Sequence, residues 1–119
     1  MYHFSISKEE QGWLFELYPN NSNNQIMGKS NYHNSPEICL ETLKKFQNWV
    51  IENRLCEEDS ENVVISQIVE NEKKKYTFSY HMNGEIIFSR GQSTYLQKIN
   101  CKKALYAIYK NINADIRKK

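Results

Sequence analysis

Glycine and cysteine are both scarce in this chain of 119 residues. The four glycines, at positions 12, 28, 84 and 91, are too scattered to form a G-x-G-x-x-G motif or a P-loop, the loops that bind phosphate groups. Cys39, Cys56 and Cys101 lie far apart and form no C-x-x-C pair, so neither a zinc site nor a disulfide framework is indicated. We therefore expect no cofactor and no metal ion.

Long apolar runs are missing as well. The longest are a few residues, far short of the ~20 that a helix needs to cross a bilayer. The N-terminus alternates polar and apolar residues and has neither the basic start nor the apolar stretch of a secretion signal. These features predict a soluble, cytoplasmic protein that makes no contact with a membrane.

No arrangement of residues suggests catalysis. A nucleophile needs a base within hydrogen-bond reach and a group that orients the base, and the three histidines, at 3, 33 and 81, share no motif. The acids Glu57, Glu58 and Asp59 are adjacent, so on an extended chain they point apart and are interpreted as solvated loop charge. Cys39 and Cys101 fall on apolar helix faces, which favours buried side chains over reactive thiols. We predict that the protein is not an enzyme and has no catalytic residues.

Aromatic residues make up 13% of the chain, which argues against disorder. The charge is divided unevenly between the two halves. Residues 1–60 hold five Lys/Arg against nine Asp/Glu, a net charge of −4, whereas residues 61–119 hold eleven against five, a net charge of +6. This asymmetry is typical of an acidic face that meets a basic one, or of a basic surface that meets a polyanion.

Two helical patterns repeat each other along the chain. The first follows Ser35-Pro36-Glu37, which has an N-cap residue, a proline and an acid in the order that starts a helix. The second follows Asn100, which we expect to be its N-cap. Both have apolar residues at i, i+4, i+7 and i+11, which fall on one helix face and predict a buried stripe. The two stripes lie 62 positions apart: Cys39, Leu43, Phe46 and Val50, then Cys101, Leu105, Ile108 and Ile112.

The predicted strands repeat in the same way. Aromatic residues alternate in two segments that are 63 positions apart, a pattern of strands with one packed face: Trp13, Phe15 and Leu17, then Tyr76, Phe78 and Tyr80. A first strand is expected in each copy, at residues 2–6 and 63–69. A third is expected at Ile26-Met27 and at residues 85–88. Tyr32 with Tyr95, and Ser30 with Ser89, recur before the helices and are interpreted as shared packing features.

The turns differ between the copies. Asn83-Gly84 suits a two-residue type I′ hairpin turn, whereas the first copy has a longer Asn-rich loop at residues 19–24. A charged hairpin loop is expected at residues 70–75. Neither half alone can bury both its strands and its helix, so the halves should share one sheet and one core. We predict a single domain over 1–119, with repeat one at 1–53, a connection at 54–62 and repeat two at 63–119.

The two copies resemble the repeats of the YegP-like family, uncharacterised bacterial proteins with tandem short repeats. The likeness lies in two sets of residues: Tyr76-Thr77-Phe78, Asn83-Gly84-Glu85, Ile87, Ser89, Tyr95 and Leu105 to Ile108, and Trp13-Leu14-Phe15, Asn24-Gln25-Ile26, Ser30, Tyr32 and Leu43 to Phe46. The resemblance implies an α+β fold of two β-β-β-α repeats that share one antiparallel sheet, with both helices packed on one face. The chain ends soon after its second helix, which leaves the family's last strand open. Because the chain carries both repeats, we expect a monomer.

Basic and aromatic residues are interleaved in the second half, a combination that nucleic-acid binders use to contact phosphates and bases. The sequence pI of about 8.4 is lower than is usual for such proteins. We therefore interpret the chain first as a protein-interaction or structural module with an unknown protein partner, and second as a nucleic-acid-binding protein. In the second interpretation, the binding residues would be Lys73, Lys74, Lys75, Arg90, Lys98, Lys102, Lys103, Tyr106, Tyr109 and Lys110.

Overall fold

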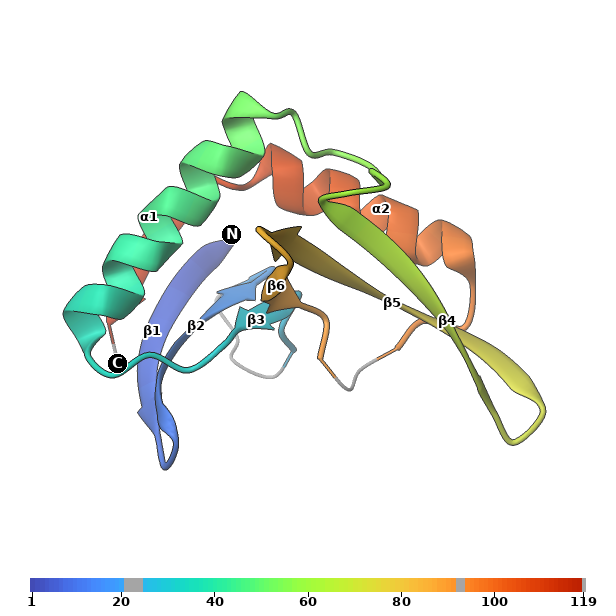
Figure 1. Ribbon diagram of the computed structural model, residues 1–119, viewed down its shortest axis with the longest axis horizontal. Helices are drawn as coiled ribbons and strands as arrows, with labels where there is room; N and C mark the ends of the chain where they lie inside the picture. The colour runs from blue at the N-terminus through green and yellow to red at the C-terminus, as the bar shows by residue number, and fades with distance from the viewer. Residues whose placement is uncertain (21–24, 92–93, 119) are drawn as a thin grey trace.

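The computed structural model describes residues 1–20, 25–91 and 94–118. It is a mixed α+β structure with one sheet of seven strands and two helices (Figure 1). Neither helix is long and apolar enough to span a membrane within the described ranges. In chain order the elements are β1 (His3–Glu9), β2 (Gly12–Tyr18), β3 (Gly28–Ser30), α1 (Pro36–Glu52), β4 (Val63–Glu70), β5 (Lys73–Met82), β6 (Glu85–Ser89), α2 (Lys98–Lys110) and β7 (Asp115–Lys118).

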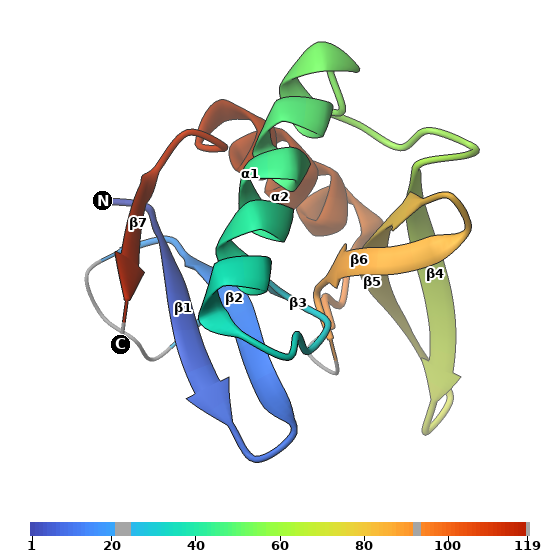
Figure 2. The same ribbon diagram turned by 60° about the vertical axis from the view of Figure 1, so that its left-hand side comes forward.

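The sheet has the strand order β4-β5-β6-β3-β2-β1-β7. The first six strands pair antiparallel, and the two halves of the chain meet where β3 pairs with β6. The seventh strand, β7, lies beside β1 and is parallel to it (Figure 2). We expected a wholly antiparallel sheet, and the parallel strand β7 shows that this prediction was wrong. The chain turns back after α2 and enters the sheet in the direction of β1. A last strand after the second helix, which the sequence left open, is therefore present.

The first helix begins where its sequence predicts. The Ser35 side chain accepts a hydrogen bond of 3.1 Å from the amide of Ile38, and Pro36 occupies the first helical position. The second helix begins earlier than expected, because its N-cap is Gln97 and no side chain caps it. Asn100 therefore lies within the first turn, and its prediction as the cap was wrong. An asparagine also fits a helical turn, so the residue type alone could not fix the start.

Both helical stripes are buried. The seven stripe residues that lie within α1 and α2 have no exposed surface, and Ile112, which follows α2, is 3% exposed. They join Phe4, Phe15 and Phe78 of the sheet in one cluster of buried side chains. Burial raises the pKa of the Cys39 thiol to about 11, and it does the same for Cys101. The expectation that these two cysteines are buried is confirmed.

Two tight turns connect the strands of the second half. Asn83 and Gly84 have φ values of 53° and 82°, and the flanking residues Met82 and Glu85 pair, as a two-residue hairpin turn requires. Asn71 and Glu72, with φ values of 52° and 65°, form a second turn of this kind, since Glu70 pairs with Lys73. The charged loop expected at residues 70–75 is therefore too long, and Lys73 to Lys75 belong to β5. Their charge suggested a loop, but exposed strand positions tolerate lysine.

The third strand of the first half lies two residues later than predicted. Glu16 and Leu17 of β2 pair with Lys29 and Gly28, so β3 is Gly28–Ser30 and not Ile26-Met27. The Met27 amide still donates to the Leu17 carbonyl, at 2.7 Å. Apolar content favoured residues 26–27, whereas the pairing with β2 fixes the actual position. Residues 21–24 of the preceding Asn-rich loop, including Asn24 of the family pattern, lie outside the described residues.

Backbone pairing shows that two of the predicted matches between the halves, Tyr32 with Tyr95 and Ser30 with Ser89, are each displaced by one residue. Trp13 exchanges two backbone hydrogen bonds with His33, and Tyr76 does so with Tyr95, so His33 and not Tyr32 has the surroundings of Tyr95. Ser79 and Glu16, 63 positions apart, pair with Ser89 and Lys29. Ser89 therefore corresponds to Lys29, and the match of Ser30 with Ser89 was wrong by one residue. The segments before the two helices differ in length, which a search at a fixed spacing does not reveal.

Candidate interaction surface

Strand β4 forms one edge of the sheet and has the sequence VVISQIVE. The first seven of these eight residues are uncharged, and most of them are β-branched. This composition suits a strand. Ile68 and Val69 are 43% and 66% exposed. In Figure 1, β4 and β5 extend together to the hairpin at the lower right, away from the helices. An edge strand presents a row of N–H and C=O groups to which another strand can bind.

The residues of β4 alternate between bonding to β5 and facing outward, as in any antiparallel pair. The backbone groups of Val63 point away from β5, since its N–H and C=O bond to the backbone of Asp59 at 3.1 and 2.8 Å. Ile65 also faces outward, because its N–H donates to Oε2 of Glu58 at 3.2 Å. The connection, residues 54–62, thus covers the first half of this edge.

Two residues further along, the edge is uncovered. By the same alternation, the N–H and C=O groups of Gln67 and Val69 face outward. No hydrogen bond to these groups occurs within the described part of the chain. We name residues 67–69 of β4 the open edge. It offers two outward N–H groups and two outward C=O groups, the pattern to which an extended chain can add as a further strand.

The acidic residues of the connection are ordered by specific contacts. Oδ1 of Asp59 accepts hydrogen bonds from the amides of Glu61 and Asn62, at 2.9 and 3.2 Å. Glu58 binds β4, as described above, and its Oε1 lies 4.0 Å from Nζ of Lys98. The interpretation of these two acids as solvated loop charge was therefore incomplete. The partners of Asp59 are local, whereas those of Glu58 lie on β4 and α2, and Lys98 is 40 residues away in the sequence.

Five of the ten residues predicted to bind nucleic acid come together on the exposed side of α2. These are Lys98, Lys102, Lys103, Tyr106 and Lys110, with Tyr106 54% exposed. Spacings of four residues place four of them in one row along the helix: Lys98, Lys102, Tyr106 and Lys110. Tyr109 is half-buried and packs against the core. The row faces the connection, because Lys102 and Tyr106 line a cavity of about 480 Å³ with Cys56, Glu57 and Glu58.

The three consecutive lysines lie apart from this row, at the start of β5. Lys73 and Lys74 are exposed, whereas Nζ of Lys75 lies 3.2 Å from Oε2 of Glu70 across the hairpin. Lys74 pairs with Val69, so its side chain emerges on the same face of the sheet as the side chain of Val69. Lys74 is therefore the lysine of this group that lies beside the open edge and on its core side.

Arg90 is used inside the fold. Its Nη1 donates to the carbonyl of Ile26 at 2.5 Å and approaches the carbonyl of Met27 at 3.4 Å. The guanidinium also lies over the Tyr95 ring, 4.5 Å from its centre. Arg90 belongs to the second half of the chain and both carbonyls to the first. Its contacts therefore join the two halves at the junction of β3 and β6.

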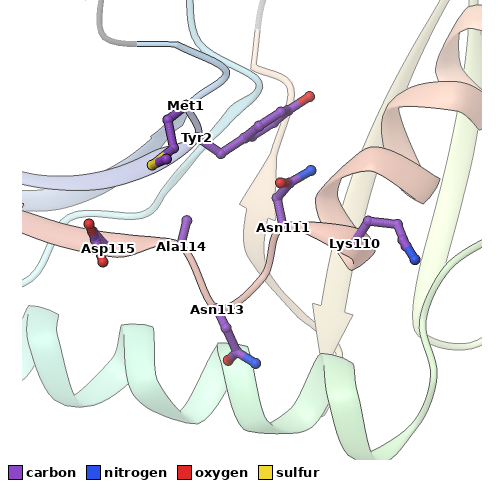
Figure 3. A pocket seen from close by; sticks show the side chains of 7 residues that line it. All are labelled: Met1, Tyr2, Lys110, Asn111, Asn113, Ala114 and Asp115. Atoms are coloured by element: carbon purple, nitrogen blue, oxygen red, sulfur yellow. The ribbon is translucent and has the colours of Figure 1, made fainter.

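Two further depressions lie elsewhere. Lys110 lines a cavity of about 340 Å³ between the end of α2 and the first residues of the chain, beside Tyr2 and Asp115 (Figure 3). A third, of about 330 Å³, includes Tyr32 and His33. Among the described residues, no group of three or more His, Cys, Asp or Glu side chains is arranged to hold a metal ion. Glu58 of the connection, Lys98 of α2 and Lys74 of β5 all lie beside the β4 edge.

The open edge was not predicted from the sequence. The run Val63–Val69 indicated a strand, but a strand is an edge only by its place in the sheet, and the strand order depends on contacts between distant residues. One signal was present: β4 contains no charge before Glu70, whereas β7 at the opposite edge is short and carries three charged residues in four. Edges that must remain unpaired are usually short or charged, so β4 is the unusual one.

Comparison with known proteins identifies the architecture. No family model and no curated protein matches the sequence. Among solved structures, the solution NMR structure of YegP, a protein of unknown function from E. coli, is similar with a TM-score of 0.68. The alignment covers 99% of this chain and 92% of that protein at 13% sequence identity, so the likeness concerns the fold. The chain therefore has the YegP-like fold.

Proposed function

We propose that the protein is a non-enzymatic interaction module that accepts an extended segment of a partner protein as an additional strand at the open edge. One observation carries the proposal: Gln67 and Val69 direct backbone groups outward from a long edge strand that has no charge before Glu70, and no described residue bonds to them. Binding by strand addition uses such groups for affinity. The protein acts as a cytoplasmic monomer in this proposal, with the partner supplying the eighth strand.

Hydrogen exchange tests this function residue by residue. In the free protein, the amides of Gln67 and Val69 should exchange rapidly, and those of Ser66 and Ile68, which face β5, should exchange slowly. A partner isolated from the native host with the purified protein should protect Gln67 and Val69. Gln67→Pro removes an outward N–H without removing a bond to β5, so it should abolish capture and leave the fold intact. Protection elsewhere, or capture by the proline variant, would overturn the proposal.

The same surface supports a second candidate, a nucleic-acid-binding function. The observation that favours it is the exposure of Lys102, Lys103, Tyr106 and Lys110 on α2. A mobility-shift titration with single- and double-stranded oligonucleotides is the test, and affinity should fall steeply with salt. Lys102→Ala and Lys103→Ala together should weaken binding, whereas Lys44→Ala, an exposed lysine on α1, should not. Absence of a shift at low salt would exclude this candidate.

We also propose that the chain is one domain of two tandem β-β-β-α repeats, at 1–53 and 63–119, with both helices on the same face of the sheet. The element order and the single buried cluster, to which both helices contribute, support this. Urea unfolding tests it, because both tryptophans, Trp13 and Trp49, lie in the first repeat. Tryptophan fluorescence and far-UV circular dichroism should report one coincident transition. Separate transitions would show that the halves unfold independently.

A further inference from the structure

The connection already occupies the first half of the β4 edge, and the way it does so indicates what the second half would bind. An added strand would supply a backbone partner for each outward residue. Asp59 does this for Val63 with both its N–H and its C=O. At Ile65 the partner is instead a carboxylate, Oε2 of Glu58. The chain thus fills this edge with one backbone pair and one acidic side chain.

The same carboxylate group contacts α2. Oε1 of Glu58 lies 4.0 Å from Nζ of Lys98, and Lys102 borders the cavity beside Glu57 and Glu58. Lys98 is about half exposed, so its ammonium can reach a second anion on the solvent side. The first turn of α2 therefore places Lys98 next to the β4 edge at the level of Ile65, and Lys102 follows one turn later.

Positive charge continues along the open edge. Val63 and Ile65 belong to the core side of β4, and by alternation so do Gln67 and Val69. Lys74 lies opposite Val69 on this side. An added strand would direct every second side chain to the core side, between Lys74 at one end and Lys98 at the other. Acidic residues at those alternate positions would meet cations, whereas basic residues would meet repulsion.

We infer that the open edge selects an extended peptide segment with Asp or Glu at every second position, and that Glu58 is the internal counterpart of such a residue. This inference rests on the proposed function, since it specifies the partner of the same edge. It differs from a general affinity for polyanions, because the peptide backbone must pair with Gln67 and Val69. The charge pattern then chooses among peptides that can pair.

Three labelled octapeptides test the inference by fluorescence anisotropy with the whole protein. They alternate valine with glutamate, with threonine or with lysine. The glutamate peptide should bind about tenfold more tightly than the threonine peptide, the effect expected of a few partly exposed ion pairs, and the lysine peptide most weakly. The difference should shrink as salt is raised. Gln67→Pro should abolish binding of all three.

Variants that change charge show which residues cause the preference for the glutamate peptide. Lys98→Glu with Lys102→Glu should remove the preference for glutamate, and the matched pair Lys44→Glu with Lys45→Glu on α1 should preserve it. Glu58→Gln removes the negative charge beside Lys98 and keeps an oxygen that can accept from the Ile65 amide, so it should tighten binding of the glutamate peptide about two- to fivefold. An unchanged affinity in Glu58→Gln would contradict a shared site.

The outcomes separate this inference from the proposed function. If the three peptides bind equally and all depend on Gln67, strand addition stands and the acidic selection is wrong. If the glutamate peptide binds but Gln67→Pro retains it, or if an oligothymidylate of equal charge displaces it and binds as tightly, the surface is a general polyanion site and the inference fails. If no peptide binds, the proposed function fails as well.

Discussion

Gly28 leaves space that the ring of Phe88 fills. A Cβ atom on Gly28 would lie 2.5 Å from Cε2 and 2.7 Å from Cζ of Phe88, closer than non-bonded carbons approach. The Phe88 ring is fully buried against Phe15 and Phe46, with centre-to-centre distances of 5.8 and 4.9 Å. Gly28 and Phe88 also stand in matching places, since Leu17 pairs with Gly28 and Tyr80 with Phe88. Where β3 and β6 meet, one large side chain fits, and the second half supplies it.

Gly28→Ala should therefore destabilise the protein by about 1–3 kcal/mol, the usual cost of overpacking a core. The backbone conformation of Gly28 is accessible to other residues, so steric contact with Phe88 is the main cause. Urea denaturation measures the change. In a Phe88→Leu background the contact with the ring is relieved and the contact with the Ser89 carbonyl oxygen, at 2.9 Å, remains, so the cost of Gly28→Ala should fall by about 1 kcal/mol. An equal cost in both backgrounds would show that Phe88 is not the residue it meets.

Leu43→Ala and Leu105→Ala should each lower the free energy of unfolding by about 2–5 kcal/mol. Both side chains are fully buried, one on each helix, and both join the same cluster. Thermal or urea unfolding gives the values. Ile99→Ala serves as the control, because Ile99 lies on α2 but is 51% exposed, and its change should stay within about 0.5 kcal/mol.

These leucines also illustrate which features of the fold could be predicted from the sequence. Helix faces depend on the spacing of neighbouring residues, so the burial of all eight stripe residues was predicted correctly, although Ile112 lies just after α2, and the Asn83-Gly84 turn was also correct. Gly28 was noticed only as a scattered glycine, since its role depends on a ring 60 residues away. The same reason explains the misplaced third strand, the parallel β7 and the open edge. Each is set by pairing between distant segments, for which a single sequence holds no local signal.

The two helix starts predict opposite effects of substitution. Ser35 caps α1 with its side chain, so Ser35→Ala should cost about 1 kcal/mol. Gln97 gives α2 no side-chain cap, and Gln97→Asp should stabilise the protein by up to about 1 kcal/mol through a cap bond and favourable charge at the helix N-terminus. Unfolding in urea measures both. A loss of stability in Gln97→Asp would mean that the start of α2 cannot adopt the capped geometry.

Stability should decrease in alkaline solution because Cys39 and Cys101 are buried as neutral thiols. Their pKa is raised from 9.0 to about 11 in the folded protein, so the unfolded chain releases these protons first as the pH rises. The stabilisation is complete below pH 9 and is lost between pH 9 and 11, at up to about 1.4 kcal/mol per pH unit for each thiol. Urea unfolding under reducing conditions at pH 8, 9 and 10 measures this slope.

The double variant Cys39→Ala with Cys101→Ala provides the control for this alkaline effect. Its stability should be lower at neutral pH because two buried side chains are truncated, but it should change little between pH 8.5 and 10. The window ends there because Tyr80 is also buried, and burial raises its pKa too. A slope in the double variant equal to that of the natural protein would assign the effect to other groups.

Arg90→Lys should destabilise the protein even though it preserves the charge. The guanidinium bonds to the Ile26 carbonyl and stacks on the Tyr95 ring, and an ammonium group cannot do both, because it has no flat face. We expect a loss of about 1–3 kcal/mol in urea unfolding, the range for a hydrogen bond to a charged group.

Lys103→Ala is the comparison for Arg90→Lys, since Lys103 is exposed on α2 and its loss should change stability by less than about 0.5 kcal/mol. The pair also separates two roles of basic residues in the second half of the chain. If Arg90→Lys leaves stability unchanged but weakens binding to an oligonucleotide, Arg90 contacts that ligand, and its bonds to the first half contribute little to stability. If stability falls and oligonucleotide binding does not, Arg90 joins the halves of the sheet, and any binding charge lies on α2.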